Sequence, residues 1–459
     1  MQAAEGYTER LLDYCMSLDY SRLPEHVLDH LKKLVLDYVG VALGGSVFAD
    51  STPVIVAGLG ALVQGMEAGT TAIGRPERYP AQYAALLNAT LAHSMDFDDT
   101  HRDAVIHIGA PVLSVALAVA EQEGASGAAF LSAAAKGYQV VGRIGRAFGD
   151  RINARGFHPT ATTGIFGATL AGADLLGLNR EALHAAWGLN LSQASGSQQF
   201  LQDGSWNKRL HPGMAAHNAM LALAVARAGF RGAREVFEGR YGYAVLYGGG
   251  QWNPERTFAP DNPEYEVLAT GVKPYPNCRY VHALIDGVID LANRHDLRPE
   301  VVDRIRIQLD RVGAQLVAQP AEVKRRPVTI VDGQFSGYFA AAVALAERSF
   351  TWNHYELMTS DRLRDLMDRT DIEADPALPS MAARIVIRTT DGREVSTEVL
   401  KPGGEPDTFP SWEELEKKFM SLAVPALGEE QAGRVAGTVR RLEQVPHIGE
   451  FTALLRPAG

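Results

Sequence analysis

The stretch "GMAAHNAMLALAVARAG", residues 213–229, decides the fold class of this chain. It is a run of alanine and leucine with a glycine at each end, a pattern that indicates a helix closed by glycine. The many small side chains allow the backbone of a neighbouring helix to approach closely. We therefore expect a tightly packed helix here, and a domain made of helices of the same kind.

The same composition extends over much of the chain. Residues 84–230 are dominated by alanine, leucine and glycine, and each candidate helix ends at a glycine or a polar break. Residues 8–44 carry apolar side chains at helical spacing, among them Leu11, Leu12, Leu31 and Leu34. No segment before residue 260 alternates convincingly as a strand. Residues 1–265 are therefore predicted to form the first part of an all-helical domain.

The sequence changes character near residue 260, where "FAPDNPEYEVLATGVKPYPNCR" is rich in proline and polar residues. In "VVDRIRIQLDRV", Ile305, Ile307 and Leu309 alternate with polar residues, as in a half-buried strand. "ARIVIRTTDGREVSTEVL" alternates on both sides of Asp391-Gly392, a pair that indicates a hairpin turn. Helical segments lie between these strands. Residues 266–404 are therefore predicted to form a smaller α+β domain.

The C-terminal segment returns to helix. Ser411 and Glu414 have the spacing of a capping box at the start of "SWEELEKKFM". We expect residues 405–459 to rejoin the helical domain. The predicted fold class is thus mainly α with an α+β second domain, and both chain ends contribute to the large helical one.

Length, charge and cysteine content exclude several classes of protein. With 459 residues, the chain is too long for one ordinary core. The 44 basic and 54 acidic residues give a net charge of −10, which argues against nucleic acid and anionic membranes as partners. No apolar run reaches the ~18 residues of a membrane helix. Cys15 and Cys278 are too few for a disulfide framework, and the first residues lack the pattern of a signal peptide, so we expect a cytoplasmic protein.

Three histidines lie within a few residues of a proline that fits the first turn of a helix: His107 with Pro111, His158 with Pro159, and His211 with Pro212. A helix N-terminus presents unpaired N–H groups and partial positive charge, which suit a carboxylate or phosphate. The same field favours a neutral imidazole that can act as a base. Lys208 and Arg209 add fixed positive charge beside one of these positions. The pattern predicts a shared anion site, although each histidine alone is compatible with a purely structural role.

The segment "HSMDFDDTHRDAVIH" is rich in aspartate, at Asp96, Asp98, Asp99 and Asp103. Three interpretations stay open. It is a solvated, helix-capping loop, or a divalent-metal cluster loosely like the aspartate-rich magnesium motif of all-helical terpene synthases, or an acid–base site in which Thr100 orients the substrate. The dinucleotide-binding and P-loop glycine motifs are absent from the sequence.

A further basic segment lies at the predicted domain junction. "KPYPNCRYVHALID" contains Lys273, Cys278, Arg279 and His282. Two prolines keep its first part extended, and the last three of these residues can share one face of a helix. Because ligand pockets favour domain interfaces, these residues are candidates for substrate binding.

At these motifs the sequence resembles the MmgE/PrpD family, which contains 2-methylcitrate dehydratases, cis-aconitate decarboxylases and an iminodisuccinate epimerase. The matching segments are "AHSMDFDDTH", "GFHPTATTGIFGAT", "LLGLNREALHAAWGLNLSQASG", "KRLHPGMAAHNAMLALAVARAGF", "KPYPNCRYVHALID", "QFSGYFAAAVAL" and "SWEELEKKF". They follow the family order across nearly the whole chain. The resemblance implies that the α+β domain acts as a lid, that the active site lies between the domains, and that the protein is a homodimer.

The resemblance also implies roles for individual residues. Decarboxylase-like members have functional groups at the positions of Asp96, Thr100, His107, His158, Lys208 and Lys273, and a histidine where this chain has Cys278. The catalytic candidates are Asp96, His107, His158 and Lys208. The substrate-binding candidates are Thr100, Arg209, His211, Lys273, Cys278 and Arg279. No metal ligand and no cofactor is predicted.

The function that these residues favour is a cofactor-independent lyase, a dehydratase or decarboxylase, acting on a small di- or tricarboxylate by proton transfer next to a carboxylate. Fixed cations and hydrogen-bond donors would stabilise the negative charge that develops. An epimerase of an iminodisuccinate-like dicarboxylate is the first alternative. The second, from another class, is a non-catalytic carboxylate-binding protein on the same scaffold.

Overall fold

The structure, a computed structural model, describes residues 6–457, so the first five residues of the N-terminal segment lie outside it. The chain forms two compact units. Unit 1 consists of residues 6–201, 206–272 and 411–457, and unit 2 of residues 202–205 and 273–410. The fold is mainly α with a smaller α+β part, as predicted.

Unit 1 is built mostly of helices. These are α1 (Tyr7–Ser17), α2 (Glu25–Phe48), α3 (Thr52–Leu62), α4 (Ala81–His93), α5 (Gly109–Gln122), α6 (Gly127–Phe148), α7 (Arg151–Ala154), α8 (Pro159–Thr162), α9 (Gly164–Leu175), α10 (Arg180–Gln193), α12 (Asn207–Arg227), α13 (Tyr243–Leu246), α20 (Trp412–Leu427), α21 (Glu429–Val439) and α22 (Ile448–Ala453). A short helix, α11 (Phe200–Asp203), lies where unit 1 passes into unit 2.

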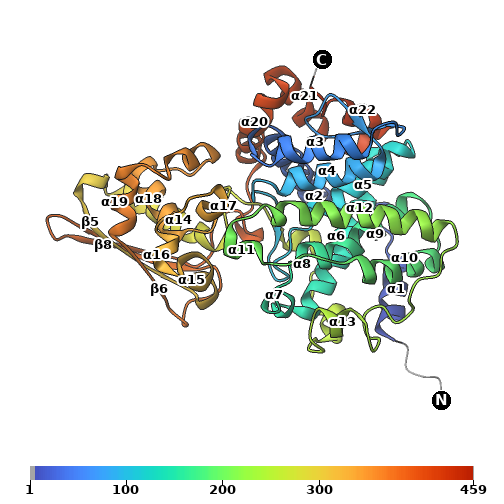
Figure 1. Ribbon diagram of the computed structural model, residues 1–459, viewed down its shortest axis with the longest axis horizontal. Helices are drawn as coiled ribbons and strands as arrows, with labels where there is room; N and C mark the ends of the chain where they lie inside the picture. Colours follow the sequence, from blue (N-terminus) through green and yellow to red (C-terminus); the bar gives the residue numbers. More distant parts are fainter. Residues whose placement is uncertain (1–5, 458–459) are drawn as a thin grey trace. The chain divides into compact units, whose positions relative to one another are not determined.

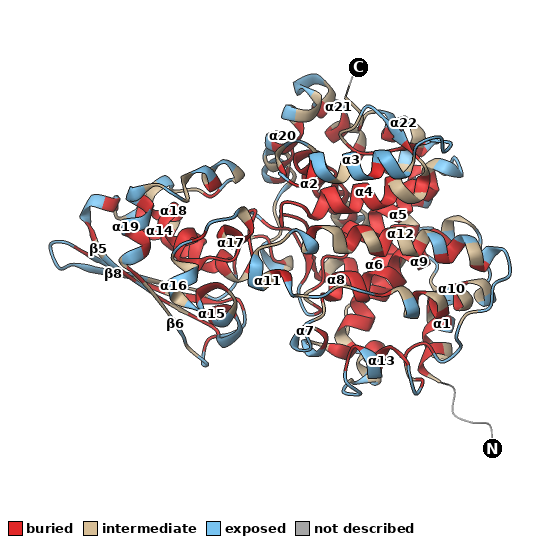
Figure 2. Cartoon of the chain, viewed as in Figure 1, coloured by how far each residue is buried: buried red, intermediate tan, exposed pale blue. Residues whose placement is uncertain are grey.

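Small side chains bring the central helices of unit 1 together, as the sequence predicts. α4 packs against α12 and α5, and α6 packs against α9 (Figure 1). A Cβ atom on Gly213 of α12 would lie 2.1 Å from Thr90 Oγ1 of α4, so only glycine fits at this crossing. Gly167 of α9 is in the same situation, because its Cβ would lie 2.6 Å from the carbonyl oxygen of Gly137 in α6. Figure 2 shows α4, α5, α6 and α9 as largely buried, whereas α12 is buried along part of its surface.

Unit 1 is not entirely helical. Two antiparallel pairs of very short strands occur in it, β1 (Thr70–Thr71) with β2 (Arg78–Tyr79) and β3 (Thr100–His101) with β4 (Thr270–Gly271). The expectation of an all-helical domain therefore needs this correction. Strands of two residues are too short to leave an alternating pattern in the sequence.

The C-terminal helices return to unit 1. The N-terminus of α20 has the predicted capping box, in which Ser411 Oγ accepts from the Glu414 N–H and Glu414 Oε2 accepts from the Ser411 N–H at 2.9 Å. α20 packs against α2 from the other end of the chain. Both ends of the described chain therefore build the same core.

Unit 2 contains one mixed sheet and several helices. Its elements are α14 (His282–Arg294), β5 (Val302–Leu309), α15 (Arg311–Ala318), α16 (Ala321–Lys324), α17 (Ile330–Gln334), α18 (Gly337–Glu347), α19 (Asp361–Asp368), β6 (Thr370–Ala374), β7 (Ala383–Thr389) and β8 (Glu394–Val399). The strand order is β6-β5-β7-β8, with β5 parallel to β6 and the other neighbours antiparallel.

Both strand predictions in unit 2 are confirmed. Ile305, Ile307 and Leu309 of β5 are buried, while their polar neighbours are not fully buried. β7 and β8 form a hairpin, and Gly392 in its turn has a φ of 85°, which glycine adopts without strain. α14 packs against β7 and β8, and α18 packs against α14.

Among residues 6–457, no single helix is long and apolar enough to cross a membrane. α2 and α3 meet that test only as a pair, bent by 92° at the break between them.

Candidate active site

An ion pair between Asp96 and Lys208 connects two helices of unit 1. Lys208 lies in the first turn of α12, and its Nζ is 2.6 Å from Oδ1 of Asp96, which follows the end of α4. The backbone φ of Asp96 is 51°, in the left-handed region that aspartate tolerates better than most residues. Asp96 is only 2% exposed, so the attraction acts in surroundings of low dielectric. Two predicted catalytic residues are therefore brought together.

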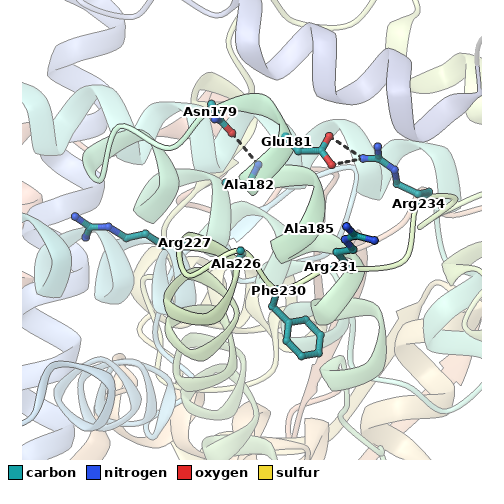
Figure 3. Close-up of a pocket in the computed structure, with 11 residues that line it drawn as sticks. Asn179, Glu181, Ala182, Ala185, Ala226, Arg227, Phe230, Arg231 and Arg234 are labelled. Atoms are coloured by element: carbon teal, nitrogen blue, oxygen red, sulfur yellow. Dashed lines mark hydrogen bonds and ion pairs between the residues drawn. The ribbon is translucent and has the colours of Figure 1, made fainter.

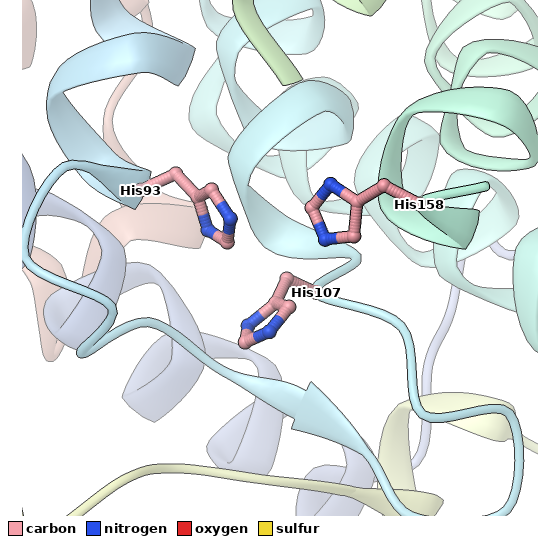
Figure 4. Close-up of side chains that lie close together, drawn as sticks. All are labelled: His93, His107 and His158. Carbon is pink, nitrogen blue, oxygen red and sulfur yellow. The ribbon is translucent and has the colours of Figure 1, made fainter. Parts of the chain in front are cut away.

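Four histidines gather beside this ion pair, and we call them the histidine cluster: His93, His107, His158 and His211. The ring centroids of His93 and His107 are 4.7 Å apart, and those of His93 and His158 are 5.5 Å apart. Figure 4 shows these three rings pointing toward one another from different elements. His211 extends the cluster, because its Nδ1 is 3.2 Å from Nδ1 of His158.

Helix ends and loops hold the cluster in place. His93 is the last residue of α4, His107 lies two residues before α5, and His158 directly precedes α8. The backbone N–H of His158 donates to the Gly196 carbonyl at 2.9 Å. The N–H of His107 donates to Thr160 Oγ1 at 3.2 Å. These contacts fix the backbone and leave the imidazole rings for the interior of the site.

A buried carboxylate, Asp98, lies between two rings of the cluster. Its Oδ2 is 2.8 Å from His93 Nδ1, and its Oδ1 is 3.3 Å from His107 Nδ1. Burial by itself raises the pKa of Asp98, but the two neighbouring rings lower it, and the result is a pKa well below the usual value. Asp98 is therefore ionised and holds both rings through its oxygens.

The other two histidines are neutral at physiological pH. Burial lowers the pKa of His158 well below its usual value, and the neighbouring His93, Lys208 and His211 lower it further. Burial also lowers the pKa of His211 to about 4, with smaller effects from His93 and Lys208. Since both rings lack a positive charge, each can accept a proton.

The other aspartates of the motif have structural roles. Asp99 accepts the Gly109 N–H at the start of α5 and the Tyr138 hydroxyl at 2.6 Å. Burial raises the pKa of Asp99 to about 8, with the nearby Asp98 charge adding to the effect. Asp103 pairs with Arg146 at 2.6 Å. Asp96 and Asp98 of this motif form a group with His107 in which the three possible ligand atoms lie within 4.8 Å of one another, but Asp96 already pairs with Lys208.

Thr100 is placed in β3, where it pairs with Gly271 of β4. Its Oγ1 is buried and has no hydrogen-bond partner among residues 6–457. A buried hydroxyl without a partner is costly, so this atom is suited to receive a hydrogen bond from a ligand.

One expectation about the helix starts is wrong. Pro111 and Pro159 lie in first turns, but α12 begins at Asn207, and Pro212 lies inside it. His211 therefore does not stand at a helix N-terminus, and the predicted anion site at Pro212 does not exist. Packing of α12 against α4 stabilises the helix despite Pro212, which removes one backbone hydrogen bond and crowds the carbonyl four residues earlier.

Lys208 and Arg209 have different environments although they are neighbours in α12. Successive helical residues point about 100° apart. Arg209 Nη1 donates to Ser51 Oγ at 2.9 Å and pairs with Asp50, at the junction of α2 and α3. Its charge is therefore compensated by Asp50, whereas Lys208 pairs with Asp96 in the site.

The remaining candidates belong to unit 2. Lys273 is fully buried, and Cys278 is buried and its backbone N–H donates to the Gln334 carbonyl. Arg279 donates through Nε to Glu405 Oε1 at 2.9 Å and through Nη1 to the Gly403 carbonyl at 3.0 Å. Arg279 thus ties the start of α14 to the loop that follows β8.

A surface pocket of unit 1 is a different feature. It has a volume of about 690 Å³ and is lined by α10, the end of α12 and the segment that follows α12, including Glu181, Arg227, Phe230 and Arg234 (Figure 3). Its ion pair between Arg234 and Glu181 is exposed and therefore contributes little energy. The buried cluster of titratable groups is the better candidate for an active site.

Family models and known relatives match nearly the whole chain. The MmgE/PrpD N-terminal domain model matches residues 9–255, and the C-terminal domain model matches residues 275–444. The chain belongs to the MmgE/PrpD family. A cis-aconitate decarboxylase-like protein, oryM, of Aspergillus oryzae is 27% identical over 98% of this chain and 97% of its own. The cis-aconitate decarboxylases of Aspergillus terreus and Homo sapiens are 25% and 26% identical, over 99% and 98% of this chain and 96% and 95% of theirs.

The Asp96–Lys208 pair and the histidine cluster lie within the MmgE/PrpD N-terminal domain match, and Lys273 lies between the two matches. Two residues of this site, His93 and Asp98, are missing from the catalytic and substrate-binding candidates, although Asp98 belongs to the aspartate-rich segment. The sequence contains one signal for them, the spacing of a histidine at the end of an apolar helix and an aspartate five positions later. That spacing alone is too common to indicate a pair.

Proposed function

We propose that this MmgE/PrpD protein is a cofactor-independent lyase that removes carbon dioxide or water from a small di- or tricarboxylate. The observation that carries the proposal is the buried Asp96–Lys208 ion pair beside neutral His158 and His211. The names of the relatives, cis-aconitate decarboxylases, favour decarboxylation over dehydration.

Lys208 is the cation that would bind a substrate carboxylate. Its ammonium group already contacts one carboxylate oxygen, on Asp96 at 2.6 Å. A substrate carboxylate can join or replace that contact. Since the site is buried, the charge of Lys208 stabilises developing negative charge more strongly than it would in water.

Proton transfer would use the histidine cluster. In a dehydration, neutral His158 or ionised Asp96 takes a proton from the carbon next to a carboxylate, and a second group protonates the leaving hydroxyl, which departs as water. In a decarboxylation, the bond to the departing carboxylate breaks, its electron pair remains on the carbon, and that carbon then takes a proton. His107 is the candidate donor, because Asp98 at 3.3 Å and Asp96 at 4.0 Å stabilise a proton on its ring.

The His158–His211 contact provides a path for the proton. Their Nδ1 atoms are 3.2 Å apart, so one ring donates and the other accepts. Thr100, whose Oγ1 has no partner among the described residues, would hold a substrate oxygen. Lys273, Cys278 and Arg279 remain proposed substrate-binding residues of unit 2, which we propose to act as a lid in a cytoplasmic homodimer.

The test is an assay of the purified protein against citrate-, aconitate- and aspartate-like acids in D₂O, followed by NMR and by carbon dioxide release. We expect net loss of carbon dioxide or water from at least one acid, and none with the matched His158→Gln variant. Deuterium incorporation without net conversion would instead identify an epimerase. Saturable binding of these acids without turnover or exchange would identify a non-catalytic binding protein. Light scattering tests the dimer.

A further inference from the structure

Three histidines of unit 1 form a group with the geometry of a metal site. His93, His107 and His158 each offer one ring nitrogen, and these atoms lie within 4.8 Å of one another. Figure 4 shows the rings converging from the end of α4, the loop before α5 and the start of α8. Imidazole nitrogen is a preferred ligand for zinc, copper and nickel ions, whereas magnesium and calcium prefer oxygen.

The state of His93 points to a missing ligand. Its Nδ1 is 2.8 Å from Asp98 Oδ2, the contact in which a metal-binding histidine commonly donates its second N–H to a carboxylate. With Nδ1 held by Asp98, Nε2 is the ring nitrogen left to bind a ligand. His93 is 1% exposed, and its Nε2 has no hydrogen-bond partner among residues 6–457. A buried ring nitrogen of this kind needs a partner, and a metal ion bound by the neighbouring imidazoles can be that partner.

Asp98 supplies the support that metal-binding histidines usually have. Such histidines commonly donate their second N–H to a carboxylate, which fixes the ring and makes the ligating nitrogen more basic. Asp98 contacts both His93, at 2.8 Å, and His107, at 3.3 Å. One buried carboxylate thus orients two of the three candidate ligands.

The charges are also suitable for a cation. The charge of Asp96 is compensated by Lys208, while the Asp98 carboxyl group contacts the two imidazoles. Metal–nitrogen bonds of about 2.0–2.1 Å place tetrahedral ligand atoms roughly 3.4 Å apart. Starting from separations of up to 4.8 Å, ring rotations that move the nitrogens by about 1 Å close the site.

We propose that His93, His107 and His158 bind one divalent transition-metal ion, such as Zn²⁺, with a fourth coordination position left for water or a substrate oxygen. The ion occupies ring nitrogens that the proposed function needs for proton transfer. Bound Zn²⁺ therefore inhibits the enzyme. The inhibition rests on the proposed function, whereas the binding does not.

Binding is tested by calorimetric titration of chelator-treated full-length protein with Zn²⁺. We expect one ion per chain. Asp98→Asn should weaken binding by about 10–100-fold, the usual effect of losing a supporting carboxylate, and His93→Gln by at least as much. His26→Gln, which changes an exposed histidine of α2, is the matched control and should leave the affinity unchanged. Excess Mg²⁺ should not compete.

X-ray absorption at the zinc edge of the loaded wild-type protein gives a readout that needs no variant. We expect three imidazole nitrogens in the coordination shell. Fewer than two imidazoles, or an affinity that neither His93→Gln nor Asp98→Asn changes, would overturn the proposed site. Turnover of a carboxylic acid by the metal-free protein tests the proposed function separately, and Zn²⁺ should abolish that turnover until a chelator is added. Full turnover by the zinc-loaded protein would overturn the inhibition.

Discussion

Replacing Lys208 by methionine should destabilise the protein in a way that depends on pH. Methionine keeps the length and the apolar part of the side chain but removes the ammonium group that lies 2.6 Å from Asp96 Oδ1. Asp96 is only 2% exposed, so water cannot replace the lost cation. The carboxylate must then remain charged in low dielectric or take up a proton.

Both outcomes have a calculable cost. Removing one partner of a buried ion pair usually costs about 3–5 kcal/mol. Protonating an aspartate of ordinary pKa near 3.9 costs about 1.4 kcal/mol per pH unit above that value, which is about 4 kcal/mol at pH 7 and about 1.5 kcal/mol at pH 5. The outcome with the lower free-energy cost determines how much unfolding free energy the variant loses. We therefore expect Lys208→Met to lose about 3–4 kcal/mol in unfolding free energy at pH 7, and at most about 1.5 kcal/mol at pH 5.

The direction follows from proton linkage. In the variant, the folded-state pKa of Asp96 is raised above its unfolded value. The folded state then holds a proton that the unfolded state lacks. The unfolding free energy of the variant is therefore closest to that of wild type below the unfolded-state pKa of Asp96. It falls behind that of wild type as the pH rises through the raised folded-state pKa of Asp96.

Urea unfolding at pH 5 and pH 7, followed by tryptophan fluorescence, measures this effect. Trp187 is fully buried in unit 1 and reports on its unfolding. The matched control is the double variant Asp96→Asn/Lys208→Met, in which no carboxylate is left without its lysine. Asparagine is chosen because it tolerates the left-handed backbone of Asp96. The double variant should recover most of the loss at pH 7.

Two results would contradict this reasoning. One is a stability difference between wild type and Lys208→Met that is the same at pH 5 and pH 7. The other is a double variant as unstable as Lys208→Met at pH 7. The cost would then come from lost packing of the lysine chain rather than from the buried charge.

Three further predictions concern the same site. His158→Gln should keep the wild-type melting temperature within a few degrees but lower kcat at least ~10²-fold, since an amide cannot exchange protons near neutral pH; a fully active variant would assign His158 a structural role. The pKa of His211 is about 4 in the folded protein, so between pH 7.5 and pH 5 this histidine takes up a proton in the unfolded chain but not in the folded protein. Over that range, the unfolding free energy of wild type should fall by about 2 kcal/mol more than that of His211→Asn. Equal losses in urea titrations would disprove this. Prolonged EDTA treatment should not lower the rate of the active enzyme, and loss with recovery on adding Mg²⁺ would revive the aspartate-cluster interpretation.

Much of the local structure could be predicted from the sequence because it depends on neighbouring residues. The capping box of Ser411 and Glu414, the hairpin at Gly392 and the alternation of Ile305 and Ile307 are interactions within a few positions or a repeat of two. The small residues of α4 and α12 likewise indicate close helix packing before the partner is known. Asp96, His158 and Lys208 could be selected by residue type and resemblance.

Tertiary packing decided how those residues combine. The Asp96–Lys208 pair exists because α4 packs against α12, and no periodicity in the sequence states which helices meet. The same packing keeps α12 helical on both sides of Pro212, although proline disfavours the interior of a helix. His93 and Asp98 became visible only as a contact at 2.8 Å, because a bond between two side chains needs both positions in space. The sequence alone determined the helices and the titratable side chains on them. Which helices pack together determined which of those side chains are buried and in contact.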